Sequence, residues 1–223
     1  MTEQNDQTLS FSERCGQFLT QHRKPIVIIL GVICAVVAVA LIASAMTTRA
    51  AKSASVETEA IISEWADLRD KNAEDMTAKE DALAEKLGKQ AVANGHTYAA
   101  FRAYTALGEI YVLRKDWEKA LAFYQKAGEA LPKAYTAGIA YFNAAVCADE
   151  LQQHDKALEL YTLSAALEDF PLKPRALFNI GRLEESLAHP DKAIEAYTKL
   201  TEAYPDNDWT LLAKSRIIAL SIN

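Results

Sequence analysis

Histidines and cysteines are the side chains in this sequence most suited to catalysis or metal binding. The histidines fall in the N-terminal tail or in predicted turns, and none has a metal-ligand spacing such as H-x-x-x-H; they are His22, His96, His154 and His189. Cys147 is isolated inside an apolar stretch, which predicts a buried thiol. No P-loop, G-x-G-x-x-G or G-x-S-x-G pattern occurs. The sequence therefore predicts no catalytic residue, no metal site and no cofactor.

Charge and composition narrow the class of protein further. The formal net charge is -6, and no dense basic stripe of the kind that binds phosphates is present, so nucleic acid is not expected as a partner. Carboxylates stand beside lysines, as in Glu118-Lys119 and Asp191-Lys192, which is typical of solvated helix faces rather than of an acid-base pair. Glycine and proline are scarce, while Ala, Leu, Glu and Lys are abundant. This mixture predicts an all-α fold.

One segment predicts a membrane span. Residues 25–46 contain no charged side chain, and a helix of roughly 20 apolar residues crosses the hydrocarbon core. We interpret residues 1–24 as a tail and residues 25–46 as a transmembrane helix. The alternative is a cleaved secretory signal, because Ala43-Ser44-Ala45 resembles a cleavage site. Against it, the apolar run exceeds the roughly 7–15 residues usual in such signals, and a long polar segment precedes it.

The charges beside this span predict its orientation. Arg14, Arg23 and Lys24 precede it, whereas Arg49 and Lys52 follow it. Basic residues favour the cytoplasmic side, so we expect a cytoplasmic N-terminus. Residues 51–223 hold 20 of the 24 basic and 27 of the 30 acidic residues, and this segment of net charge -7 would lie on the far side of the membrane.

Three similar segments indicate repeated helical hairpins. They are Asp116–Tyr124, Asp155–Tyr161 and Asp191–Tyr197. Each is interpreted as a helix start at which the aspartate caps exposed backbone N–H groups. In each, an alanine precedes a tyrosine by four residues, and this spacing places both side chains on one face of a helix.

Residues 101–134 resemble the tetratricopeptide repeat (TPR), a 34-residue pair of antiparallel helices. The matching positions are Tyr104, Leu107-Gly108, Tyr111, Ala120, Tyr124, Ala127 and Pro132. Tyrosines stand where the family prefers tryptophan and then phenylalanine. Gly108 and Ala120 are small where the two helices are expected to cross closely, and Pro132 is expected to end the second helix.

Two further copies complete the predicted repeat domain at residues 101–207. A weaker copy spans about residues 138–171, and a third spans about residues 174–207. A helix at residues 208–222 is expected to cover the last exposed face of the solenoid. Residues 53–95 predict two more helices, with breaks at 71–74 and 94–95. These helices form either a degenerate first repeat or a semi-independent stalk.

The layout of the chain also resembles the family that contains the ancillary subunit of the bacterial Sec translocon. The short tail, the single span, the two divergent helices and the Asn94–Tyr104 entry to the repeats carry this resemblance. It implies a single-pass inner-membrane protein whose periplasmic TPR domain assists protein export, with Sec components or exported proteins as partners. The last repeat, with Tyr204-Pro205-Asp206, resembles periplasmic TPR proteins of envelope assembly and cell division. A structural scaffold is therefore the alternative function.

The TPR resemblance implies that protein partners bind a concave groove lined by the first helix of each repeat. By register, the predicted groove residues are Arg102, Phe142, Asn143, Arg175, Phe178, Asn179 and Arg182. Asparagine amides at these places suit an extended peptide backbone, and Arg175 and Arg182 suit a carboxylate. The chain lacks the full lysine set of peptide-clamping repeats, so a surface without a defined ligand remains the alternative.

Overall fold

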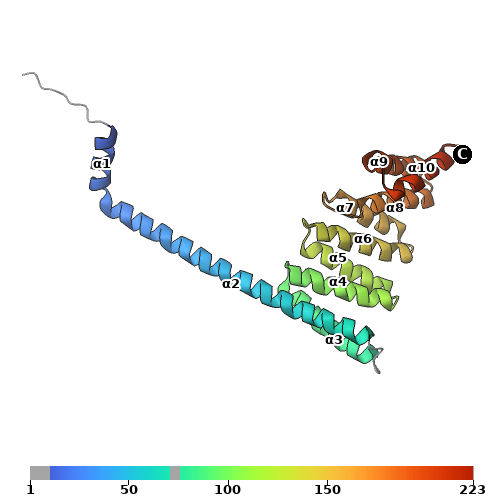
Figure 1. Ribbon diagram of the computed structural model, residues 1–223, viewed down its shortest axis with the longest axis horizontal. Helices are drawn as coiled ribbons and strands as arrows, with labels where there is room; N and C mark the ends of the chain where they lie inside the picture. Colours follow the sequence, from blue (N-terminus) through green and yellow to red (C-terminus); the bar gives the residue numbers. More distant parts are fainter. Residues whose placement is uncertain (1–10, 71–75, 223) are drawn as a thin grey trace, which may run out of the picture. The chain divides into compact units, whose positions relative to one another are not determined.

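Ten α-helices and no strand make up the part of the chain that the computed structural model describes, residues 11–70 and 76–222 (Figure 1). The helices are α1 Phe11–Gln21, α2 Arg23–Asp70, α3 Met76–Asn94, α4 Tyr98–Leu113, α5 Trp117–Ala130, α6 Tyr135–Glu150, α7 His154–Ala166, α8 Lys173–Ser186, α9 Pro190–Ala203 and α10 Asp208–Ile222. The prediction of an all-α fold is confirmed.

The chain divides into two compact units, residues 1–50 and 51–223. The first unit holds α1 and the apolar part of α2. Its apolar side chains are exposed, with Val27 at 67% and Leu41 at 65% of their surface. By length and composition α2 is apolar enough to cross a membrane. The first of the two helices predicted within residues 53–95 was expected to be separate from the span, whereas α2 runs unbroken from Arg23 to Asp70. The predicted break at 71–74 lies outside the described residues.

The second unit contains three successive helical hairpins, α4–α5, α6–α7 and α8–α9, followed by α10. Figure 1 shows the helices from α3 to α10 stacked side by side. The hairpins fall on the three segments that the sequence interpreted as repeats, and α10 occupies the residues expected for the closing helix. The largest buried cluster runs from α5 to α8, and in it small alanines lie between aromatic and branched side chains.

The last turns of α2 and the whole of α3 pack against the first hairpin. Trp65 of α2 and Leu87 of α3 are buried in one cluster with Leu107 and Ile110 of α4. Burial of these large apolar side chains favours one continuous stack, at roughly 1.5–3 kcal/mol for each side chain. The residues of α2 after position 50 therefore contribute to the repeat domain.

A glycine opposite a tyrosine sets the crossing inside two of the hairpins. A Cβ atom added at Gly108 would lie 2.7 Å from Cε1 of Tyr124, and one added at Gly181 would lie 2.7 Å from Cδ1 of Tyr197. Both tyrosines are buried. A larger residue would push the helices apart, so the absence of a side chain at these positions allows the close approach.

The turns inside the hairpins correct one prediction. Lys115, Gln152 and Ala188 adopt left-handed backbone conformations there, with φ near 56°, 57° and 59°. Asp116 is the N-cap of α5, and its side chain accepts a hydrogen bond from the Lys119 backbone N–H. Asp155 and Asp191, also interpreted as caps, lie instead in the first turns of α7 and α9. The prediction for these two was wrong, because α7 and α9 each begin one residue before the aspartate, at His154 and Pro190.

Candidate functional site

Side-chain contacts join α4 to α2, α6 to α8 and α8 to α10. Glu59 of α2 pairs with Arg102 of α4, Asp149 of α6 pairs with Arg182 of α8, and the rings of α8 and α10 meet. These contacts place the exposed sides of α4, α6 and α8, with α10 and residues 51–70 of α2, along one surface. We call this surface the first-helix face. All seven predicted groove residues belong to its helices.

Arg102 is held by a carboxylate of its own chain. Its Nη2 atom donates to Oε2 of Glu59 over 2.9 Å, and its Nε atom donates to Oε1 of the same carboxylate. The hydrogen bond from Arg102 lowers the pKa of Glu59, although partial burial opposes the shift. Arg102 therefore ties α4 to α2, and its guanidinium is already occupied.

Arg182 and Asn179 are engaged in the same way. The guanidinium of Arg182 pairs with the Asp149 carboxylate, and its Nε donates to Oδ1 of Asn179 over 3.5 Å. Because Asn179 and Arg182 are three residues apart on α8, this contact runs along one helix face. The structure brings these two predicted residues together, and it supplies Arg182 with an internal carboxylate.

The two predicted phenylalanines have different environments. Phe142 is 3% exposed and packs edge-to-face on Tyr161, with 5.2 Å between ring centroids, and on Phe170. Phe178 is half-buried between Tyr197 and Trp209. Phe142 is thus a core residue in this structure, whereas Phe178 keeps part of its ring at the surface.

Of the three predicted arginines of the first-helix face, Arg175 is the one without an ion pair within the described residues. Its guanidinium carbon lies 5.3 Å from the ring centroid of Phe142 and 5.7 Å from that of Trp209, and it forms no ion pair within the described residues. Contact with aromatic faces holds a planar guanidinium while its N–H edges stay available. Asn143, which follows Phe142 on α6, is half-buried, and its amide makes no hydrogen bond among residues 11–70 and 76–222. This arrangement suits recognition of a carboxylate beside a peptide backbone.

Trp209 is the residue of this surface that sequence reasoning missed. The sequence predicted only a closing helix over residues 208–222, without assigning its aromatic side chain. Trp209 is the second residue of α10, and it contacts both Arg175 and Phe178. A tryptophan at the start of a helix that follows the last repeat was the available signal, because large amphipathic rings at such places often form interaction surfaces.

Glu109 of α4 lies on the same face, nearer the N-terminal end of the stack. Its side chain is exposed, yet protein atoms crowd the carboxylate, and the resulting loss of hydration raises its pKa. Arg102 and Arg69 oppose this shift. An exposed but crowded carboxylate is expected on a hollowed surface.

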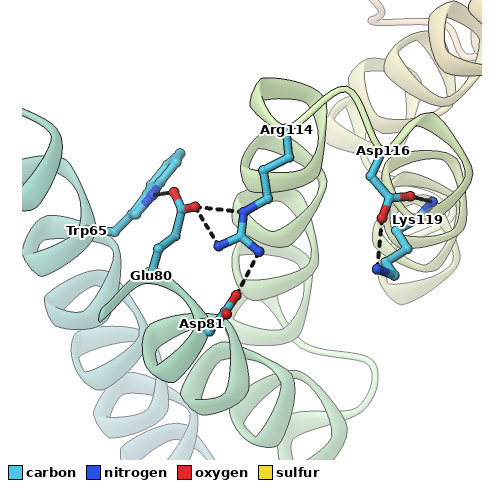
Figure 2. Close-up of polar contacts among 6 residues, drawn as sticks. All are labelled: Trp65, Glu80, Asp81, Arg114, Asp116 and Lys119. Carbon is cyan, nitrogen blue, oxygen red and sulfur yellow. Dashed lines mark hydrogen bonds and ion pairs between the residues drawn. The ribbon is translucent and has the colours of Figure 1, made fainter. Parts of the chain in front are cut away.

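A second polar cluster, shown in Figure 2, joins α2, α3 and α4. The Trp65 indole donates to Oε1 of Glu80 over 2.8 Å, and Arg114 Nε donates to the other oxygen over 2.7 Å. Arg114 also donates to Asp81 from Nη1, over 2.7 Å. Glu80 is buried, and each of these groups has a partner within the chain. The cluster therefore stabilises the packing of α2, α3 and α4 and is not a candidate ligand site.

The described residues show no grouping suited to metal chemistry. Among them, no set of three or more His, Cys, Asp or Glu side chains could hold a metal ion. Cys147 is 1% exposed, and burial raises the pKa of its thiol to about 12. A thiol in this state is not a nucleophile at neutral pH.

Comparison with known proteins identifies the repeats. Tetratricopeptide repeat models match residues 103–133 and 162–208. A TPR repeat-containing protein of Treponema pallidum (strain Nichols) is 39% identical over 226 aligned residues, which cover 94% of each chain. A tetratricopeptide repeat protein of Parabacteroides merdae superposes with a TM-score of 0.56 at 21% identity, covering 74% of this chain and 60% of that one, and it supports the fold alone. TPR domains bind other proteins, and nothing in these relatives indicates catalysis. The chain belongs to the tetratricopeptide repeat proteins.

Proposed function

We propose that this TPR protein is anchored in a bacterial inner membrane by residues 25–46 and that its repeats bind protein segments in the periplasm, as an accessory of protein export or periplasmic folding. The observation that carries the proposal is the uncharged part of α2, residues 25–46, whose large apolar side chains are exposed in the described structure. Such a surface is stable only in hydrocarbon or against a partner.

The relative supports a bacterial membrane, and the charges beside the span support a cytoplasmic N-terminus. The relative that aligns with nearly the whole chain is bacterial. Basic residues are more frequent before the span than directly after it, which favours a cytoplasmic N-terminus. The resemblance in layout to the ancillary Sec subunit family supports export as the process served.

The first-helix face is the proposed binding surface for these segments. Arg175 offers N–H edges to a carboxylate, Asn143 offers an amide to an extended backbone, and Trp209 offers an apolar ring. Arg102 and Arg182 are tied to Glu59 and Asp149, so they shape this surface without donating freely to a ligand.

Topology provides the first test. A reporter that is active only outside the cytoplasm, fused after Asn223, is expected to be active in intact cells. Alkaline extraction of the membranes is expected to leave the full-length chain in the pellet. A C-terminus inside the cell would contradict both export assistance and an envelope scaffold. Release of the chain by alkaline buffer would contradict the anchor.

Partner capture provides the second test. A photo-crosslinking amino acid at Asn143 is expected to capture translocon components or exported chains in intact membranes. The same label at Lys133, which is exposed in the linker after α5, serves as the control. Identical capture from both positions, or no export-related partner above background, would contradict the proposal.

A scaffold in envelope assembly or cell division is the second candidate function. The resemblance of the last repeat, with Tyr204-Pro205-Asp206, favours it. A scaffold is expected to concentrate at the septum or at sites of outer-membrane assembly. Uniform distribution of a fluorescent fusion around the cell would count against this function and in favour of export.

A further inference from the structure

Helix α10 packs on α8 in the way that α8 packs on α6. Arg216 of α10 pairs with Glu185 of α8, and Arg182 of α8 pairs in the same way with a carboxylate of α6. The two arginines are 34 residues apart. The same interval separates Arg175 and Trp209, each of which lies against a phenylalanine of the preceding first helix. Helix α10 is therefore the first helix of a fourth repeat, in the same register as α8.

The first hairpin defines the face of a first helix on which the second helix packs. Gly108 of α4 lies against the ring of Tyr124. Tyr104 and Tyr111 lie on either side of this glycine along α4, and both pack on Phe123, with 6.3 and 5.5 Å between ring centroids. Both of the contacted rings belong to α5, so these three positions of α4 mark its contact with the second helix.

The equivalent positions of α10 are exposed. The third hairpin carries the register, because Gly181 lies 73 residues after Gly108 and also faces a tyrosine of its second helix. A further 34 residues lead from the third hairpin to Leu211, Ser215 and Ile218 of α10. Among residues 11–70 and 76–222, no second helix covers these side chains, and Leu211 is 71% exposed.

An apolar face at the end of a repeat stack is unusual, since terminal repeats normally carry a polar outer face. In Figure 1, α10 lies at this end, after α9. Ile222, which is 78% exposed, extends the row of Leu211, Ser215 and Ile218 by one turn. The four residues are spaced by four, three and four positions, which is the spacing of a seam between two packed helices. The exposed face of α10 is thus shaped to receive another helix.

The seam is complementary to itself when two copies of α10 run antiparallel. About a two-fold axis between residues 216 and 217, Leu211 of one copy meets Ile222 of the other, and Ser215 meets Ile218. A large side chain lies opposite the small serine, as a tyrosine lies opposite the glycine in the first and third hairpins. The antiparallel direction is also the direction of the second helix in each hairpin.

The charges are compatible with this pairing. Lys214 lies beside the seam, and the antiparallel register places it opposite Ala219 of the other copy, so that like charges do not meet. Arg216 is already paired with Glu185. The chain before and at the start of α10 is acidic, with Glu202, Asp206 and Asp208. This end of the stack is therefore not a basic patch, and it does not favour an anionic lipid surface.

We propose that the chain forms a two-fold dimer in which α10 of each copy packs antiparallel on α10 of the other. Each α10 then takes the place of the second helix in the other copy's fourth repeat. The four seam residues become buried at this contact. The dimer leaves the first-helix face to its own ligand, because the seam lies on the side of the first helices that receives the second helices.

Light scattering of the full chain in detergent micelles, at about 50 μM, tests the dimer. The wild type is expected to show twice the mass of one chain after the detergent is subtracted. Ile218→Glu places a carboxylate in the apolar contact, and it is expected to raise the dissociation constant of the dimer about a hundredfold or more. Val92→Glu changes an exposed apolar residue of α3 and is the control, which is expected to dimerise as the wild type does.

A pair of complementary variants tests the register. Ser215→Lys is expected to weaken the dimer about as much as Ile218→Glu, because its ammonium group meets Ile218 of the other copy. A mixture of the two variants is expected to recover the dimer to within about tenfold of the wild type, since the ammonium of one copy meets the carboxylate of the other. Both positions are exposed in the single chain, so each variant is expected to unfold within about 2 °C of the wild type.

A photo-crosslinking amino acid at Leu211 tests the contact in intact membranes, where it is expected to join two copies of the chain. The proposal is overturned if the wild type is a monomer in micelles, if the crosslink captures only other proteins, or if the mixed variants do not recover the dimer. It is also overturned if Ile218→Glu dimerises as tightly as the wild type, which would place the contact in the span or elsewhere. These results do not depend on where the repeats lie or on what the first-helix face binds.

Discussion

The first and third hairpins, α4–α5 and α8–α9, share an internal contact and differ in what surrounds it. Both cross at a glycine that faces a tyrosine, Gly108 with Tyr124 and Gly181 with Tyr197. The first hairpin is joined to α2 and α3 by the buried Glu80 cluster, whereas the third is joined to α10 through Glu185, which accepts from Arg216 and Tyr197. The repeat is thus defined by its interior crossing, and its stability and binding depend on its neighbours.

The largest expected effect comes from the cluster beside the first hairpin. Glu80→Ala removes the acceptor for the Trp65 indole and one partner of Arg114, and we expect it to lower the free energy of unfolding by about 3 kcal/mol. Glu185→Ala should cost about 1 kcal/mol, because Arg216 remains half-exposed to water.

Urea unfolding of the full chain, followed by tryptophan fluorescence, measures both changes, since all three tryptophans lie in residues 51–223. Glu85→Ala, on the exposed side of α3, is the control and should stay within about 0.5 kcal/mol of the wild type. Equal losses of unfolding free energy for Glu80→Ala and Glu185→Ala would mean that α2 and α3 stabilise the first hairpin no more than α10 stabilises the third.

The shared crossing is tested by adding one methyl group to each hairpin. Gly108→Ala and Gly181→Ala force the added carbon against a tyrosine ring, and each should cost about 1–3 kcal/mol. Gly88→Ala on α3 meets no atom within 4 Å, and it should gain about 0.5–1 kcal/mol through helix propensity. The same urea assay measures all three, and a loss at Gly88 as large as at Gly108 would contradict the role of close approach.

Helix capping is expected to give a smaller difference in unfolding free energy between the first and third hairpins. Asp116→Ala deletes a side chain that caps α5, which should cost about 1 kcal/mol. Asp191→Ala removes only a favourable charge in the first turn of α9, which should cost about 0.3–0.5 kcal/mol. Thermal unfolding curves of the two variants decide the order, and a larger loss for Asp191 would mean that it caps α9 in solution.

The smallest expected effect is the pH dependence of the unfolding free energy. Hydrogen bonds from Arg102 and Arg216 lower the pKa values of Glu59 and Glu185 below the ordinary 4.5. Their contribution is therefore complete above pH 4.5, and it is lost as the pH falls through the lowered values. Because both pairs are partly exposed, each should account for less than about 1 kcal/mol.

The pH effect is measured as the difference in unfolding free energy between pH 7 and pH 3.5. Glu59→Gln and Glu185→Gln should each reduce this difference. An unchanged pH dependence in both variants would show that other carboxylates govern acid unfolding.

Much of the architecture was predictable because each repeat carries its own local pattern. The Leu107-Gly108 pair and the alanine-tyrosine spacing in α5 fixed the register of the first hairpin, and α10 begins at Asp208, as expected. Local patterns do not specify where a helix ends when no breaker is present. For this reason the first helix predicted within residues 53–95 proved to be part of α2, and two of the three predicted aspartate caps lie inside their helices.

The proposed binding surface was less predictable, since it depends on contacts between repeats. The sequence placed seven residues on the first helices of the hairpins. The sequence pattern did not show that Arg102 and Arg182 would form ion pairs and that Arg175 would not. The structure supplies the first two with carboxylates from neighbouring helices and leaves the third between two rings.

By itself the sequence determined the all-helical class, the apolar segment of α2 and the repeat family, because periodicity, composition and the spacing of small and aromatic residues act within one helix or one hairpin. Only the tertiary structure decided which of the three predicted arginines remains without an ion pair, and that Phe142 lies in the core. These features arise where side chains of different repeats meet, and the distances between such side chains are set by packing rather than by position along the chain.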